Sequence, residues 1–197
     1  MDASVTSIGP GDALLVIDVQ NDFLPGGSLA VRDGDAVIAP LNRVLALFAQ
    51  HRLPVFATRD WHPPDHCSFT AQGGPWPVHC VAGTKGAGFP AALHLPTSTT
   101  VVSKAVAAER DAYSGFERTE LAELLRMQGV RRLFVGGLAT DYCVLATVRD
   151  ACAAGFAVVV LTDAVRAVEL HAGDGERALQ GMRDLGALFG QSVELSK

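Results

Sequence analysis

The chain has 197 residues, 49% of them hydrophobic, which favours a folded protein with a sizeable core over a disordered one. Its formal net charge of −5 provides no excess of basic residues, so we expect no nucleic-acid partner. The apolar runs are too short to cross a bilayer, and residues 1–5 lack the basic and apolar start of a signal peptide, so we expect a cytoplasmic protein without a membrane partner.

Short apolar runs alternate along the chain with longer segments of helical periodicity. The runs are continuously apolar, which is typical of strands in a parallel sheet that is covered on both faces. In chain order we predict strand 13–19, helix 35–51, strands 54–58 and 100–103, helix 117–128, strand 132–136, helix 141–154, strand 157–161, helix 175–188 and, on a weaker signal, strand 192–195. This alternation predicts an α/β fold: a single domain over residues 1–197, built as a three-layer sandwich with a mainly parallel six-stranded sheet and helices on both faces.

Two segments break the alternation. Residues 61–96 are rich in Pro, Gly and His, and residues 105–116 are also irregular. Long irregular connections in a compact domain are usually functional loops, so we expect a functional role for both.

Three reactive residues stand at the ends of predicted strands. Asp18 closes the first strand, Lys104 closes the third, and Cys143 follows the fourth. Because ligands of open α/β sheets bind beyond the carboxyl ends of the strands, we expect the three side chains to meet in one crevice. Taken singly, each has a plainer explanation: a turn cap for Asp18, a solvated charge for Lys104 and simple packing for Cys143.

The position of Cys143 favours covalent chemistry. Thr140 is the predicted N-cap of the helix, which places Cys143 in the first turn, at the positive end of the helix dipole. The dipole and the Lys104 cation then favour the thiolate, and Asp18 can take the thiol proton. This arrangement suggests nucleophilic attack on an acyl group.

A second group of residues is typical of a divalent-metal site. Asp60 and His62 directly follow a strand, and His79 lies in a Pro-rich loop. One carboxylate and two imidazoles suit Zn²⁺, Fe²⁺ or Mn²⁺, and His66 is a candidate for a further ligand or for a residue that supports the ligands. A closed structural zinc site completed by two cysteines is an alternative; the cysteines concerned are Cys67 and Cys80.

The whole pattern resembles the nicotinamidase (pyrazinamidase) branch of the isochorismatase-like cysteine hydrolases. The resemblance covers nearly the whole chain and depends on several separate motifs in the same order. These motifs are Asp18-Val19-Gln20-Asn21-Asp22-Phe23, Arg59-Asp60-Trp61-His62, Trp76-Pro77-Val78-His79-Cys80, Lys104, Tyr113-Ser114-Gly115-Phe116 and Gly137-Leu138-Ala139-Thr140-Asp141-Tyr142-Cys143.

The resemblance implies a role for each matching residue and an isochorismatase-like fold with Rossmann-like topology. Cys143 is then the nucleophile, Asp18 the general base and acid, and Lys104 their charge partner. The implied metal ligands are Asp60, His62 and His79; the implied substrate-binding residues are Phe23 and Trp76, on either side of a pyridine ring, with Leu138 and Tyr113. The resemblance also implies a cis Leu138-Ala139 peptide and an oxyanion hole from the N–H groups of Ala139 and Cys143. One departure is Ala105, where many relatives have glycine.

The implied activity is hydrolysis of nicotinamide to nicotinate and ammonia through a cysteine thioester, in NAD salvage, with pyrazinamide as a second substrate. The implied cofactor is one divalent metal ion, with Zn²⁺ favoured over Fe²⁺ or Mn²⁺, and the implied partner is a small molecule; the sequence makes no prediction of oligomeric state. One alternative is a related metal-independent cysteine amidase for another small substrate. A non-enzymatic alternative is a zinc-stabilised binding module. A dinucleotide-binding oxidoreductase is disfavoured because the first predicted strand is not followed by G-x-G-x-x-G.

Overall fold

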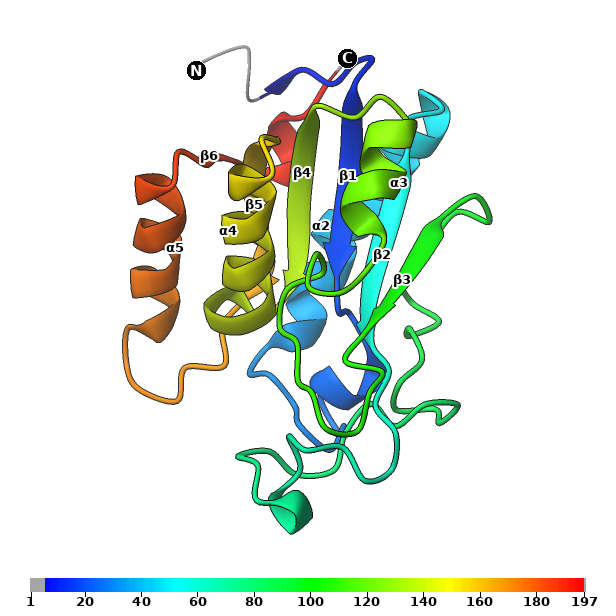
Figure 1. Cartoon of the computed structure of the whole chain (residues 1–197). Coiled ribbons are helices and arrows are strands. Elements are labelled where there is room, and N and C mark those ends of the chain that lie inside the picture. The colour runs from blue at the N-terminus through cyan, green and yellow to red at the C-terminus, as the bar shows by residue number, and fades with distance from the viewer. Residues whose placement is uncertain (1–5, 197) are drawn as a thin grey trace.

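The computed structural model describes residues 6–196; residues 1–5, which carried the expectation about a signal peptide, and residue 197 lie outside the described part. Its centre is a six-stranded sheet in which every neighbouring pair of strands is parallel, as predicted (Figure 1). The strands are β1 (Asp12–Ile17), β2 (Val55–Asp60), β3 (Thr100–Lys104), β4 (Arg132–Leu138), β5 (Ala157–Arg166) and β6 (Leu188–Gly190). Their spatial order is β3-β2-β1-β4-β5-β6, which is the order of a doubly wound sheet.

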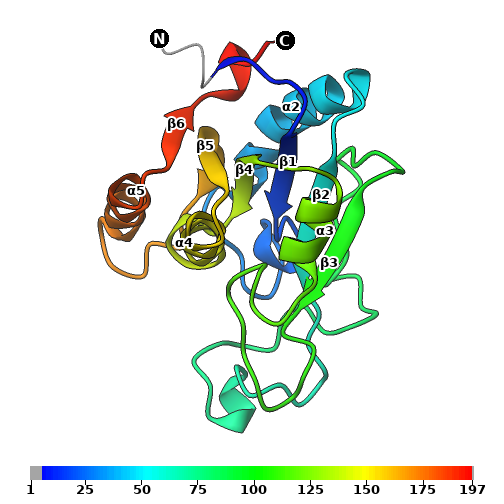
Figure 2. The ribbon, with the colours of Figure 1, turned by 45° about the horizontal axis from the view of Figure 1, so that its top comes forward.

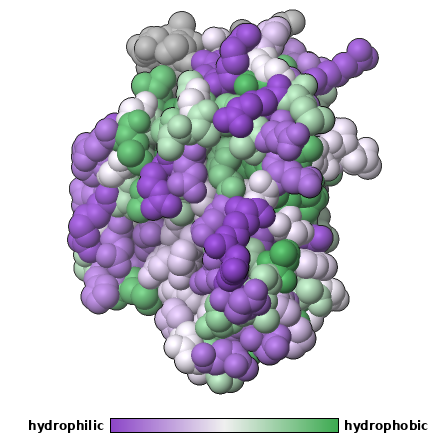
Figure 3. Space-filling view, viewed as in Figure 1, coloured by the Kyte–Doolittle hydropathy of each residue, from purple (hydrophilic) through white to green (hydrophobic). Residues whose placement is uncertain are grey.

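Helices cover both faces of the sheet and complete the predicted three layers (Figure 2). Helix α2 (Ile38–Gln50) lies on one face, and α3 (Leu121–Met127), α4 (Leu145–Ala153) and α5 (Asp174–Asp184) lie on the other. The fully buried β1 separates two apolar clusters: Leu14 and Val16 pack on the α2 side, whereas Leu15 and Ile17 pack on the side of the other three helices. Hydrophilic residues cover much of the outer face of those three helices (Figure 3).

Shorter helical turns connect these elements. The first predicted helix begins as a 3₁₀ turn, η2 (Gly34–Val37), and α2 then starts at Ile38. Pro40 therefore falls in the first turn of α2, where backbone N–H groups have no intrahelical partner in any case. The remaining turns are η1 (Asn21–Phe23), η3 (Thr70–Gln72), the π-helical η4 (Thr140–Val144) and η5 (Ser192–Glu194).

The last helix and the last strand of the chain differ from the prediction. Helix α5 ends at Asp184, and β6 pairs with β5 at Leu188–Gly190, so the predicted strand 192–195 was wrong and the predicted helix 175–188 was too long. Gly186, with φ of 90°, lies between α5 and β6. Ser192 turns away from the sheet because its backbone N–H donates to the Asp163 carboxylate at 2.9 Å.

The carboxyl ends of the strands meet at one edge of the sheet. The long connection from β2 to β3 and the connection from β3 to α3 gather below this edge, in the lower half of Figure 1. Among residues 6–196, no helix has the length and apolar character that a transmembrane span requires.

Candidate active site

Four buried ionisable residues lie at the carboxyl ends of neighbouring strands, and two of them, Asp18 and Cys143, follow the strands between which the strand order reverses. Asp18 directly follows β1, Asp60 and Lys104 end β2 and β3, and Cys143 lies in η4 after β4. All four side chains are at most 7% exposed. The sheet therefore brings together residues that are up to 125 positions apart, at the place where doubly wound sheets bind ligands.

The Lys104 ammonium lies at the centre of this group. Its Nζ lies 3.0 Å from Asp18 Oδ2, 2.5 Å from Asp60 Oδ1 and 3.5 Å from Cys143 Sγ, and it also donates to a backbone carbonyl, that of Ala112, at 3.1 Å. A carboxylate oxygen of Asp18, one of Asp60 and Cys143 Sγ all lie within 4.8 Å of one another. The acid, amine and thiol predicted to converge are thus in mutual reach.

Burial and charge set the ionisation of this group. Burial alone lowers the pKa of Lys104, but the carboxylates of Asp18 and Asp60 raise that pKa well above its ordinary value, so the amine is a cation. Burial also raises the pKa of the Cys143 thiol well above its ordinary value; Lys104 opposes this shift and Asp18 reinforces it. Lys104 lowers the pKa of Cys143 as expected from the sequence, but burial and the carboxylates of Asp18 and Asp60 act in the opposite direction.

The chain around Cys143 is sharply bent. The Leu138-Ala139 peptide is cis, as the resemblance implied, and Gly137 adopts a φ of 134°. The Ala139 carbonyl accepts hydrogen bonds from the N–H groups of Tyr142 and Val144 at 3.1 and 3.0 Å. The residue in the N-cap position is Ala139, in extended conformation, so the prediction that Thr140 caps this helix was wrong.

The predicted metal-binding residues also come together. One ligand atom each of Asp60, His62 and His79 lies within 4.8 Å of the other two. The Nδ1 atoms of His62 and His79 lie 3.1 and 2.8 Å from the carbonyls of Ala105 and Pro77, and a carbonyl can only accept, so each Nδ1 donates and Nε2 is the nitrogen left for a metal ion. Burial and the neighbouring imidazoles lower the pKa of His62 to about 3, which keeps its ring neutral. Two imidazoles oriented by backbone carbonyls and one carboxylate fit a divalent cation.

His66 lies beside this cluster. Its ring stacks on that of His62 with a centroid distance of 4.1 Å, and its two nitrogens contact Ser68 Oγ at 2.8 Å and the Arg110 carbonyl at 3.0 Å. Because both nitrogens already have protein partners, His66 supports His62 in this structure. The alternative zinc site is not formed, since no cluster of candidate ligands among the described residues includes Cys67 or Cys80.

Sequence reasoning assigned no role to two buried residues that orient the site. The Gln20 side-chain amide donates to the Asp60 carbonyl at 2.8 Å and accepts from the Asp60 N–H at 2.7 Å. The Thr58 hydroxyl donates to Asp18 Oδ1 at 2.6 Å. Gln20 lies within a motif that carried the resemblance, whereas nothing in an apolar strand marks Thr58 in advance.

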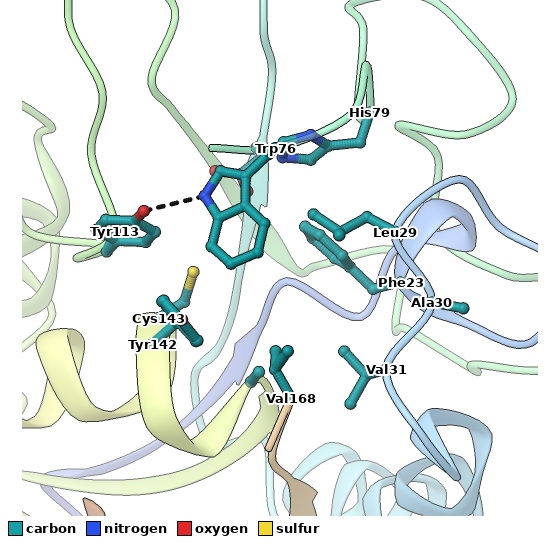
Figure 4. Close-up of a pocket in the computed structure, with 12 residues that line it drawn as sticks. Phe23, Leu29, Ala30, Val31, Trp76, His79, Tyr113, Tyr142, Cys143 and Val168 are labelled. Atoms are coloured by element: carbon teal, nitrogen blue, oxygen red, sulfur yellow. Dashed lines mark hydrogen bonds between the residues drawn. The ribbon is translucent and has the colours of Figure 1, made fainter. Parts of the chain in front are cut away.

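Cys143, Asp60 and His79 open onto one cavity, and Figure 4 shows Cys143 and His79 at its wall. Trp76 Nε1 donates to the Tyr113 hydroxyl at 3.1 Å across its wall. The predicted residues Phe23, Trp76 and Tyr113 line this cavity, but Leu138 does not, because its side chain is buried in the core on the α2 side. Ala139, the predicted oxyanion-hole residue, and Tyr142, from the same motif, also line the cavity. The lining residues that the sequence did not indicate are Leu29, Ala30, Val31 and Val168.

A model of the isochorismatase domain matches residues 12–192, nearly the whole chain. The chain belongs to the isochorismatase family. The nicotinamidase of Escherichia coli is 37% identical to this chain over an alignment of 199 residues, gaps included. The alignment covers 90% of this chain and 93% of that protein. These matches confirm the resemblance that the sequence motifs indicated.

Two solved structures of the family have the same fold as this chain. The pyrazinamidase of Pyrococcus horikoshii in complex with zinc has a TM-score of 0.89 and 46% identity, over 92% of this chain and 99% of that one. The PnC1 protein of L. infantum in complex with nicotinate has a TM-score of 0.90 and 40% identity, over 98% of both chains. The predicted isochorismatase-like α/β sandwich is thereby confirmed.

Proposed function

We propose that this protein is a nicotinamidase that hydrolyses nicotinamide to nicotinate and ammonia, accepts pyrazinamide as well, and serves NAD salvage. The observation that carries the proposal is one aromatic-walled cavity onto which both a buried thiol and the Asp60, His62 and His79 cluster open. The names of the E. coli, P. horikoshii and L. infantum relatives support the same reaction.

In the proposed reaction, Cys143 is the nucleophile and Asp18 moves the protons. Asp18 takes the thiol proton as sulfur attacks the carboxamide carbon, and it then gives that proton to the leaving nitrogen as the C–N bond breaks. Asp18 next deprotonates the water that attacks the thioester carbon, and it returns this proton to the Cys143 sulfur as the C–S bond breaks and the acid product is released. Lys104 stays protonated throughout, and its charge offsets the negative charge that moves between Asp18 and sulfur, 3.0 and 3.5 Å away.

Backbone donors would stabilise the tetrahedral oxyanion. We assign this role to the N–H groups of Ala139 and Cys143, which flank the bend at the start of η4. In other oxyanion holes, removing one donor costs about 3 kcal/mol of transition-state stabilisation.

We assign the binding of one divalent cation to Asp60, His62 and His79. Zn²⁺ is our first choice because the P. horikoshii relative was crystallised with zinc, and the same ligand types suit Fe²⁺ and Mn²⁺. When bound, the ion would supply a Lewis-acid site for a ring nitrogen of the substrate. Phe23 and Trp76 would then hold the two faces of the ring within the cavity.

The charge of the cavity favours a neutral amide. Among the described residues that line it, the one permanently charged side chain is the carboxylate of Asp60, and there is no lysine or arginine. The nearby Lys104 ammonium is already paired with two carboxylates. Apart from the proposed metal ion, an anionic amide would therefore meet no cationic side chain in the cavity wall, whereas uncharged nicotinamide or pyrazinamide would not need one.

The proposal is tested by measuring ammonia and nicotinate from zinc-loaded enzyme supplied with nicotinamide. We expect Cys143→Ala to lose at least about a thousandfold in kcat, because removal of the nucleophile abolishes the covalent route. Cys152→Ala is the matched control, since Cys152 lies at the end of α4 outside the cavity and should leave kcat unchanged. Turnover by Cys143→Ala, or none by the wild type, would refute the proposal.

We further propose a single domain over residues 1–197 and a cytoplasmic location. One continuous sheet with two apolar clusters supports the first. The four cysteines are free thiols in the structure, which suits a reducing compartment and supports the second.

A further inference from the structure

Thr58 contacts the proposed general base twice. It lies in β2, next to the end of β1, and its side chain is completely buried. Its hydroxyl donates to Asp18 Oδ1 at 2.6 Å, and its backbone carbonyl accepts from the Asp18 N–H at 3.2 Å. The second contact positions the backbone of Asp18, whose φ of 49° is uncommon for a residue other than glycine.

The two oxygens of the Asp18 carboxylate consequently have different surroundings. Oδ1 is engaged by the short hydrogen bond from Thr58. Oδ2 faces Lys104 Nζ at 3.0 Å and, among the described residues, has no partner with hydrogen-bond geometry. One oxygen of this carboxylate lies within 4.8 Å of Cys143 Sγ, and Oδ2 is the oxygen that the Thr58 hydroxyl leaves open to a proton from the thiol.

We propose that Thr58 is a positioning residue for the reaction: its hydroxyl fixes the rotation of the Asp18 carboxylate so that Oδ2 is presented to Cys143. This role rests on the proposed function of Asp18 as the base. Without the hydroxyl, the plane of the carboxylate can rotate about its bond to Cβ, and fewer molecules have an oxygen aligned with the thiol.

The hydroxyl and the methyl group of Thr58 serve different contacts, so they can be tested separately. A Cβ placed on Gly115 would lie 2.7 Å from Thr58 Cγ2, which shows that the methyl group packs closely against that glycine. Thr58→Val keeps the shape and the methyl contact but removes the hydroxyl. Thr58→Ser keeps the hydroxyl but removes the methyl group.

The test compares both variants with the wild type as full-length, zinc-loaded protein. We expect Thr58→Val to lower kcat by about tenfold to a hundredfold with KM within about twofold, because a hydrogen bond to a charged group is lost away from the substrate. Thr58→Ser should retain kcat within about threefold. Alkylation of Cys143 by iodoacetamide, followed at its peptide by mass spectrometry, should slow in Thr58→Val and not in Thr58→Ser.

Three results would overturn the proposal. They are an unchanged kcat in Thr58→Val, an equal loss in both variants, and a loss of bound zinc in Thr58→Val that accounts for the lower activity. The alkylation rates do not depend on the identity of the substrate. If the wild type released no ammonia from nicotinamide, the proposed function would fail, while the alkylation comparison would still decide the role of Thr58.

Discussion

Lys104 shows how burial and neighbouring charges determine the ionisation of single residues at this site. Its ammonium is enclosed and balanced by Asp18 and Asp60, and removing one partner of such a buried pair leaves an uncompensated charge. The sequence predicted that Asp18, Lys104 and Cys143 would converge, because all three follow strands of one sheet. It could not predict that burial and two carboxylates raise the pKa of Cys143, since the degree of burial depends on long loops without periodicity.

Tyr113 provides a test of how the cavity wall is held. Its hydroxyl accepts from Trp76 Nε1 at 3.1 Å, so Tyr113→Phe removes one neutral hydrogen bond that orients the indole. We expect KM for nicotinamide to rise by about threefold to tenfold with little change in kcat, as measured by steady-state kinetics.

Tyr142→Phe is the matched control for this substitution. The Tyr142 ring contacts both Trp76 and Tyr113, but no hydrogen bond of its hydroxyl is found within residues 6–196. The KM of Tyr142→Phe for nicotinamide should stay within about twofold of that of the wild type. Equal effects of the two substitutions would contradict a specific role for the Tyr113 hydroxyl.

At the scale of elements, the apolar runs located most strands correctly, whereas the helical periodicity located the ends of the helices poorly. The strand β5 extends to Arg166, beyond the predicted end at 161, because the pairing shifts register and resumes between Gly137 and Val165. Polar Thr162 and Asp163 interrupt the apolar pattern there. Helix α3 begins four residues later than predicted, and Arg118, with φ of 55°, lies within the excluded stretch.

Gly137 tests whether the end of β4 determines the placement of Cys143. A Cβ at this position would lie 2.0 Å from the Ile17 carbonyl oxygen, and the φ of 134° is unfavourable for other residues. We expect Gly137→Ala to lower the free energy of unfolding by about 2–4 kcal/mol in urea denaturation, and to lower kcat as well.

Gly181→Ala in α5 is the control for this substitution. Its added Cβ would meet Leu145 Cδ1 at an ordinary 3.8 Å, so stability should be unchanged or higher by up to about 1 kcal/mol. If Gly137→Ala were as stable as Gly181→Ala, the close approach of β4 to β1 would not be a constraint.

At the scale of the whole molecule, the topology accounts for most of what the sequence could predict. The parallel sheet places the ends of β1, β2, β3 and β4 at one edge, so residues distant in sequence meet there. The apolar walls from Leu29, Val31 and Val168 were missed, because loop residues of this kind carry no chemical signal. Their positions depend on tertiary contacts, such as the hydrogen bond of 2.9 Å that the Val168 N–H donates to the Asp141 carboxylate.

Removal of the metal distinguishes an enzyme from a zinc-stabilised module. Two large apolar clusters on either face of the sheet form the core, so we expect chelation to abolish activity while the circular dichroism spectrum remains that of a folded protein. Added Zn²⁺ should restore turnover. Unfolding on chelation would favour the binding module, and full activity without metal would favour a metal-independent amidase.

Trapping of the thioester tests most directly whether Cys143 is the nucleophile. Zinc-loaded enzyme is mixed with nicotinamide, quenched in acid within the first turnovers and digested, and its peptides are analysed by mass spectrometry. We expect a mass increase equal to one nicotinoyl group on the peptide that contains Cys143, and none in Cys143→Ala. A nicotinoyl group on another residue, or ammonia release by Cys143→Ala at the rate of the wild type, would contradict the proposed mechanism.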